Sequence, residues 1–196
     1  AFRKKTDPSV PAALGDQFAV YGDKPSLDGA VQLYEIAVDK SDVASGNGRL
    51  HSLRLKLADA YIQSRQPGKA ATLLQELLKS PKDDADRAIL QRRLAEAQLQ
   101  IPPYVPGAQA LAAIAKTEPA GGLAGILKLV FDQAQSLQAA DKAADALAVL
   151  KTFRDTLGAK WGGSAEAGRM ETLTQRVARA LFDKAVAGLT SEDAAV

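Results

Sequence analysis

The sequence predicts an all-α protein. Apolar residues make up 46% of the 196 residues and recur at helical spacing almost everywhere, whereas strict alternation of apolar and polar residues is nearly absent. Alanine is frequent and aromatic residues account for only 5%, a composition that favours closely packed helices over sheets. Proline and glycine residues punctuate the pattern, as expected for helices joined by turns.

The first half of the chain carries clear start and stop signals. Asp7 precedes Pro8 and is expected to cap a short helix that ends near Tyr21, and a second helix is expected over 26–40. A turn at 64–68 separates the next two apolar stripes, and Pro67 can begin the following helix because the first turn of a helix has no use for its missing N–H group.

The second half follows the same plan. Pro81 ends one helix, and Asp83 is placed to cap another that runs to about Gln100, where the proline-rich segment 101–106 breaks it. Four further helices are expected over 108–117, 121–139, 141–157 and 165–188. The chain is therefore expected to form one continuous domain over 1–196, with four antiparallel helix pairs and one additional helix.

One helix pair shows a repeated pattern of residues. Leu57, Ala58 and Tyr61 lie on its first helix, and Ala70, Leu74, Leu77 and the closing Pro81 belong to its second. This unit, about 51–82, resembles a tetratricopeptide repeat, and weaker copies of the pattern extend the resemblance over 8–157. The resemblance implies a right-handed superhelical α-solenoid with an extended concave surface, closed by a capping helix over 165–189.

The repeat has a packing rationale. Small residues at Gly15, Ala58 and Ala95 would allow close approach of a partner helix, while Phe18, Tyr34 and Tyr61 would fill the space between neighbouring pairs. The last helix is expected to cover the end of the array with an apolar stripe made of Met170, Leu173, Val177, Ala180 and Leu181.

Superposition of the repeats reveals acidic residues at one shared position. Asp16, Asp59, Glu96 and Asp132 each follow directly after the residue at the small position of a first helix. Arg92 precedes Glu96 by one turn, and Lys128 precedes Asp132 in the same way. Two interpretations stay open here: a solvated helix face, or a set of groups that faces a ligand.

The resemblance places this acidic position on the concave groove. Asp16, Asp59, Arg92, Glu96, Lys128 and Asp132 are therefore the candidate partner-binding residues. An acidic groove favours a basic or amphipathic segment of another protein, and it disfavours capture of a terminal carboxylate. We accordingly expect a non-catalytic interaction module or assembly scaffold. The alternative is a membrane-tethered structural or oligomerisation domain that uses its convex face or capping helix.

Composition argues against several other classes of function. The chain has no Cys and one His, so thiol nucleophiles, cysteine zinc sites and multi-histidine metal centres are excluded, and we expect neither an enzyme nor a cofactor. A net charge of +2 provides no broad footprint for nucleic acid. His51, between Arg49 and Arg54, is expected to be an exposed residue at a helix end.

Two aromatic residues lie in breaks between helices. Trp161 stands in a glycine-rich joint, and Tyr104 stands among prolines. A residue of this kind either plugs the core beneath its loop, which is the commoner outcome, or serves as an exposed binding anchor.

The basic N-terminal segment is relevant to the cellular compartment of the protein. The basic run 2–5 is either a frayed terminus within a flexible segment over 1–7, or the stub that follows a removed membrane anchor. No apolar run approaches the roughly 18 residues of a membrane span. We expect a periplasmic or membrane-anchored bacterial protein rather than a cytoplasmic one, although the lack of Cys suits either compartment.

Overall fold

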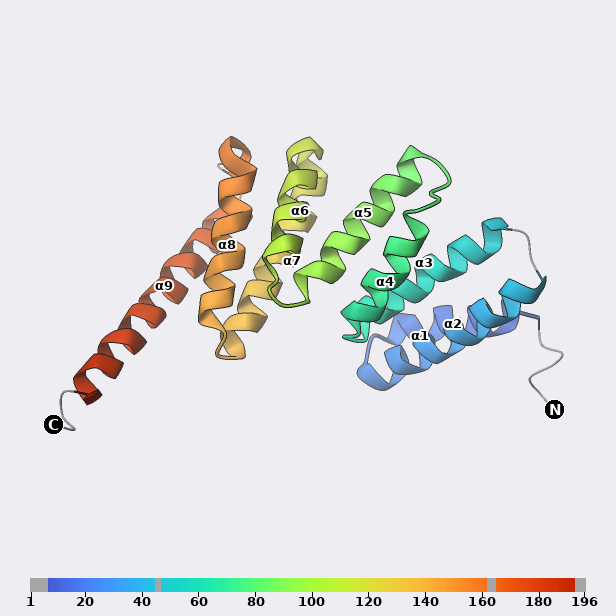
Figure 1. Ribbon diagram of the computed structural model, residues 1–196, viewed down its shortest axis with the longest axis horizontal. Helices are drawn as coiled ribbons and strands as arrows, with labels where there is room; N and C mark the ends of the chain where they lie inside the picture. The colour runs from blue at the N-terminus through green and yellow to red at the C-terminus, as the bar shows by residue number, and fades with distance from the viewer. Residues whose placement is uncertain (1–6, 45–46, 162–164, 193–196) are drawn as a thin grey trace. The chain divides into compact units, whose positions relative to one another are not determined.

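The computed structural model describes residues 7–44, 47–161 and 165–192 (Figure 1). Within these ranges the chain forms nine α-helices and one short 3-10 helix, and no strand, which confirms the all-α prediction. The helices are α1 Ser9–Tyr21, α2 Lys24–Ala44, α3 Asn47–Gln63, α4 Pro67–Leu77, α5 Asp84–Leu99, α6 Val105–Thr117, α7 Ala120–Ala139, α8 Ala143–Leu157 and α9 Ala165–Glu192, with η2 Gly158–Trp161 between the last two.

The expected start signals act as proposed. Asp7 Oδ1 accepts a hydrogen bond of 2.9 Å from the backbone N–H of Ser9, and Asp83 Oδ1 accepts one of 2.7 Å from the N–H of Asp86. Pro67 is the first residue of α4. Each of these groups satisfies or removes a backbone donor that the first turn of a helix leaves unpaired.

The start of α6 differs from the prediction. The helix begins at Val105 rather than near 108, because Pro106 lies in its first turn, where proline is tolerated. Tyr104 precedes it with a positive φ of 66°, a backbone conformation that is uncommon for residues other than glycine. Its side chain is 5% exposed, so it is a core residue of the turn and not a surface anchor.

The described chain divides into two compact units. Unit 1 is Ala1–Ala97 and holds α1 to α4 with most of α5; unit 2 is Gln98–Val196 and holds the end of α5 with α6 to α9. The predicted single domain over 1–196 and the predicted right-handed superhelix both depend on how the two units are arranged relative to each other. Both therefore stay predictions.

Helices of unit 1 pack in chain order. Helix α1 contacts α2, α2 contacts α3, and α3 contacts α4. Gly15 shows why the small position matters, because a Cβ atom there would lie 2.9 Å from Cε1 of the buried Tyr34 ring. Ala58 and Ala95 are also buried, as expected. Phe18 differs: it lies over Gly29 but stays 40% exposed.

Unit 2 is built around α8. Helices α6, α7 and α9 all contact it, and α9 also contacts α7. Phe153 of α8 is among the largest fully buried side chains. The expected stripe of α9 is buried at Met170, Leu173 and Val177, but its last two residues, Ala180 and Leu181, are exposed and half-buried. The buried part of the stripe therefore ends at Val177, about one turn earlier than predicted.

Candidate functional site

The carboxylate of Asp16 on α1 is held by groups from two other helices. The Tyr34 hydroxyl of α2 donates a hydrogen bond of 2.6 Å to Oδ1, and Lys56 Nζ of α3 lies 2.7 Å from both oxygens. Burial alone would raise the pKa of Asp16, but the hydrogen bonds from Lys56 and Tyr34 outweigh it and hold this pKa below its ordinary value. Asp16 is thus a structural ion-pair residue that keeps about half of its side chain exposed.

Asp59 and Glu96 belong to a second ion-pair network in unit 1. Arg93 Nε lies 2.9 Å from Asp59 Oδ1, and Arg93 Nη1 donates to Glu96 Oε2 over 2.9 Å. Arg92 Nε donates to the other oxygen of Glu96 over 3.2 Å. The Glu96 side chain is only 8% exposed. Of the two open interpretations, the solvated helix face is therefore wrong at Glu96, whose carboxylate is buried between two arginines.

The burial of this network shifts two pKa values. Desolvation raises the pKa of Asp59, and the Arg93 guanidinium beside it offsets only part of that effect. Desolvation of Arg93 acts to lower the pKa of the guanidinium, but Asp59 and Glu96 together raise it above its ordinary value. The arginine therefore stays charged between the two carboxylates.

A tyrosine–carboxylate contact that the sequence did not reveal repeats the arrangement at Asp16. The Tyr61 hydroxyl of α3 donates to Glu35 Oε1 of α2 over 2.6 Å, and Lys69 of α4 lies 3.9 Å from the same oxygen. Each carboxylate thus receives a tyrosine from the next helix and a lysine from the helix after it. The spacing of Tyr34 and Tyr61 is the one sequence signal that could have indicated it.

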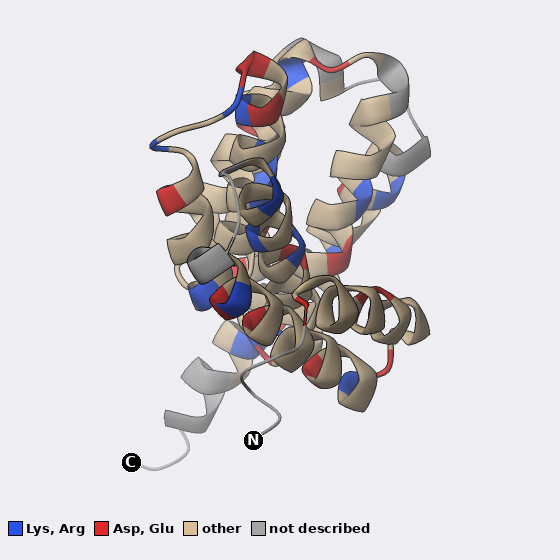
Figure 2. Cartoon of the chain, turned by 90° about the vertical axis from the view of Figure 1, so that its right-hand side faces the viewer, with Lys and Arg blue, Asp and Glu red and all other residues tan. Residues whose placement is uncertain are grey.

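These contacts leave little unbalanced negative charge in unit 1. Each of the three acidic candidates there, Asp16, Asp59 and Glu96, has a cationic partner. Figure 2 shows both signs of charge distributed over the helices. The expectation of a basic partner depended on unpaired negative charge at these residues, and that charge is neutralised by neighbouring cations.

His51 is placed differently from the prediction. Its side chain is only 10% exposed, and Nε2 lies 2.9 Å from Asp86 Oδ1. The second oxygen of Asp86 accepts a hydrogen bond of 3.0 Å from the backbone N–H of Lys82. His51 therefore ties α3 to the start of α5, and the sequence could not show this because the two residues are 35 positions apart.

The remaining candidates lie in unit 2, on α7. Lys128 Nζ donates to Asp132 Oδ2 over 2.5 Å, and both side chains are more than half exposed. Unlike Glu96, this pair occupies a solvated helix face, where such a pair contributes a few tenths of a kcal/mol.

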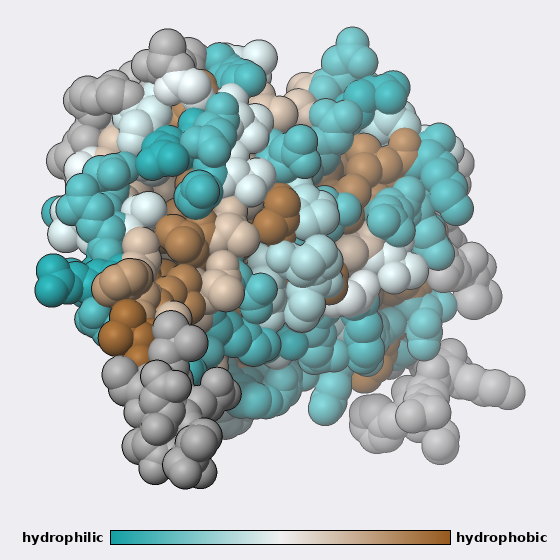
Figure 3. Space-filling model, turned by 60° about the vertical axis from the view of Figure 1, so that its left-hand side comes forward, coloured by the Kyte–Doolittle hydropathy of each residue, from teal (hydrophilic) through white to brown (hydrophobic). Residues whose placement is uncertain are grey.

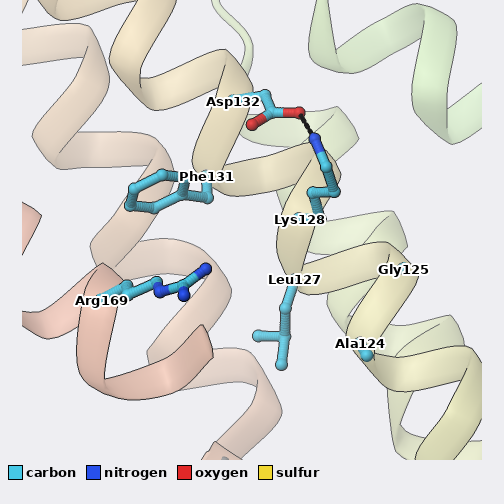
Figure 4. Close-up of a pocket in the computed structure, with 7 residues that line it drawn as sticks. All are labelled: Ala124, Gly125, Leu127, Lys128, Phe131, Asp132 and Arg169. Atoms are coloured by element: carbon cyan, nitrogen blue, oxygen red, sulfur yellow. Dashed lines mark hydrogen bonds and ion pairs between the residues drawn. The ribbon is translucent and has the colours of Figure 1, made fainter. Parts of the chain in front are cut away.

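The Lys128–Asp132 pair borders an open hollow of about 450 Å³ between α7 and α9. Four further residues of α7 line this hollow: Ala124, Gly125, Leu127 and Phe131. Arg169 of α9 completes the wall, and Figure 4 shows its guanidinium extending toward the space beside Phe131 and Leu127. The small residues Ala124 and Gly125 thus leave the hollow open on one side. Leu127 and Phe131 form its apolar floor, and the charged groups of Lys128, Asp132 and Arg169 form its rim.

Two residues of this hollow are predicted from the sequence, and the others are not. Lys128 and Asp132 are candidate partner-binding residues from the sequence, and Phe131 directly precedes Asp132 on α7. Arg169 was missed, because a single arginine on a helix carries no pattern that separates it from other surface cations. Figure 3 shows further hydrophobic residues in separate patches between hydrophilic side chains.

Trp161 packs on the core of unit 2. Its ring meets the ring of the buried Phe153 edge-on, with centroids 6.3 Å apart and an interplanar angle of 63°. The indole is partly exposed, but its main contact supports the interpretation as a core plug.

Comparison of the chain with protein-family models, with curated proteins and with solved structures gives no match. Among the described residues, no group of His, Asp and Glu is arranged to hold a metal ion. No helix within the same ranges has the length and apolar character needed to cross a membrane. The basic run 2–5 lies outside the described residues.

Proposed function

We propose that the protein is a non-catalytic protein–protein interaction module of the tetratricopeptide-like class, and that the hollow between α7 and α9 docks an amphipathic segment of a partner. The observation that carries this proposal is the combination of an apolar floor, Leu127 and Phe131, with charged groups at the rim. Specific binding sites commonly combine such a floor with a few placed polar groups.

The dimensions of the hollow suit a peptide side chain. About 450 Å³ lies within the range of roughly 300–1,000 Å³ typical of ligand sites, but this hollow is open along the surface and not enclosed. An open hollow between two helices can receive the apolar face of a third helix, as in other helix-in-groove complexes. A partner segment would therefore insert one or two large apolar side chains.

The helical-repeat part of the proposal rests on the repeat pattern and on local packing. In unit 1, each of the helices α1 to α4 packs on the next one along the chain, and Gly15 and Ala58, the small residues of the first two repeats, are both buried. Such packing is typical of arrays in which each repeat contacts its neighbours. A right-handed superhelix with a concave surface would extend this local order through the chain.

Selection of peptides against the purified chain tests the proposed function. Peptides from a displayed random library that bind the wild type are compared on two variants of α7, Phe131→Ala and Leu129→Ala. Phe131 lines the hollow, whereas Leu129 is exposed on the same helix and does not line it. Phe131→Ala should weaken binding by about tenfold or more, the usual loss at an apolar anchor, and Leu129→Ala should not.

Equal binding by both variants would contradict docking at this hollow. The emission of Trp161, the single tryptophan, serves as the control that unit 2 keeps its core.

A second candidate function is self-association through α1. Val10, Leu14, Phe18 and Tyr21 form one outward stripe, each between 40% and 73% exposed. Asp16, the single charged residue of α1, binds Tyr34 and Lys56, so the stripe itself is uncharged and could face a second copy of the chain without repulsion. Sedimentation equilibrium tests this candidate: it predicts a dimer for the wild type and a monomer for Phe18→Asp, and a wild-type monomer at high concentration would refute it.

A further inference from the structure

The charges around the hollow are not balanced. Lys128 is paired with Asp132, whereas Arg169 has no ion-pair partner among the described residues. Glu171, the nearest described acidic residue along α9, lies 3.7 Å from Arg154 of α8 instead. The lining of the hollow therefore carries one positive charge in excess, and that charge belongs to Arg169.

The position of Arg169 favours recognition of a carboxylate. Its guanidinium extends into the hollow beside Phe131 and Leu127, as Figure 4 shows. A planar guanidinium can bind a carboxylate with two parallel hydrogen bonds. A partner that covers the hollow would exclude water around this pair, which strengthens the attraction but also penalises a cation left without a partner.

We propose that the segment docked in this hollow is acidic and amphipathic, with a carboxylate that binds Arg169 next to a large apolar side chain that rests on Phe131 and Leu127. This inference rests on the proposed function and specifies the chemistry of its partner. It departs from the basic partner expected from the sequence, because the carboxylates that suggested it in unit 1 are paired with cations of their own. A basic segment would place a second cation against Arg169, which costs binding free energy.

Three synthetic helical peptides test the inference. They share one apolar face, and they carry glutamate, glutamine or lysine at the positions that flank it. Fluorescence anisotropy measures their affinity for the full chain at low and at physiological salt. The glutamate peptide should bind about tenfold more tightly than the glutamine peptide, a typical effect of a charged hydrogen bond at an interface, and the lysine peptide should bind most weakly.

Charge reversal provides the matched comparison. Arg169→Glu should reverse the order, so that the lysine peptide binds more tightly than the glutamate peptide. Arg176→Glu is the control, because Arg176 is an exposed arginine of the same helix that does not line the hollow. It should leave the wild-type order intact, whereas an equal effect of both variants would mean that only the general charge of α9 matters and would overturn the inference.

The outcomes separate the two proposals. If all three peptides bind with equal affinity and Phe131→Ala weakens each of them, the hollow docks apolar segments but the acidic preference is wrong. If Phe131→Ala weakens none of them, docking at the hollow is wrong, and the acidic preference falls with it. If Arg169→Glu reverses the order of the peptide affinities and Arg176→Glu does not, both docking at the hollow and the preference for an acidic segment are established.

Discussion

Gly15 of α1 lies directly against the ring of Tyr34 on α2. A Cβ atom at Gly15 would come within 2.9 Å of Cε1 and 3.1 Å of Cδ1 and Cζ of this ring. Tyr34 cannot easily move away, because its side chain is buried and its hydroxyl binds Asp16. The contact between Gly15 and Tyr34 thus sets the distance between α1 and α2, and the same tyrosine holds the carboxylate of Asp16.

Gly15→Ala should therefore destabilise the protein, although alanine is normally the better helix residue by about 0.5–1 kcal/mol. Overpacking against Tyr34 should outweigh this gain and lower the free energy of unfolding by about 1–3 kcal/mol. Gly68→Ala on α4 is the matched control, since nothing lies within 4 Å of its Cβ position. Urea unfolding followed by circular dichroism should show the control at or slightly above wild-type stability; equal effects would mean that α1 and α2 do not approach so closely.

Glu96→Lys should be strongly destabilising. The substitution would place a third cation beside Arg92 and Arg93 at a buried position, and breaking a buried ion pair in this way costs about 3–5 kcal/mol. Asp132→Lys reverses the same charge on the exposed face of α7 and should change the free energy of unfolding by less than about 0.5 kcal/mol. Similar losses in both variants would contradict the burial of Glu96.

Asp16 and Asp59 should affect the pH dependence of stability in opposite directions. The pKa of Asp16 is lowered from 3.8 in the folded protein, so its ionised form adds stability above that pH, and this stability is lost as the pH falls through the folded pKa. The pKa of Asp59 is raised from 3.8, so its ionisation removes stability as the pH rises from that value through the folded pKa.

Urea unfolding of Asp16→Asn and Asp59→Asn between about pH 3 and about pH 7 checks both signs. Relative to the wild type, Asp16→Asn should lose stability as the pH rises, and Asp59→Asn should gain it. Parallel curves for the two variants would show that the two carboxylates occupy similar environments.

Leu74→Ala tests the core of unit 1. Leu74 of α4 is fully buried within the hydrophobic cluster that includes Tyr61 and Ala70. Its truncation leaves a cavity and should lower the free energy of unfolding by about 2–5 kcal/mol. Leu73→Ala, at a neighbouring position that is only partly buried, should cost distinctly less.

The sequence predicts the helices well because their signals are local. The hydrogen bonds of Asp7 and Asp83 reach backbone groups two and three residues away, and Pro67 is itself the first residue of its helix. The spacing of apolar residues in turn indicates which face of each helix is buried. The sequence places the start of α6 too late because a run of prolines predicts a break, whereas the first turn of a helix tolerates Pro106.

The candidate site was less predictable because its chemistry depends on contacts between distant residues. The shared position of the acidic residues in the repeats stays a prediction, and it could not show that Asp59 pairs with Arg93 of another helix whereas Asp132 pairs with Lys128, one turn away on its own helix. In the same way, His51 is buried because Asp86 reaches it from another helix. Arg169 gains its significance only when α9 packs beside α7.

The most direct test of the central claim is an NMR titration of the full, isotope-labelled chain with the glutamate peptide. We predict that the largest changes in amide chemical shift fall on residues 124–132 of α7 and on the turns of α9 around Arg169, that unit 1 changes little, and that Phe131→Ala suppresses the response. Binding whose largest changes fall outside α7 and α9 would contradict the assignment of this hollow as the docking site.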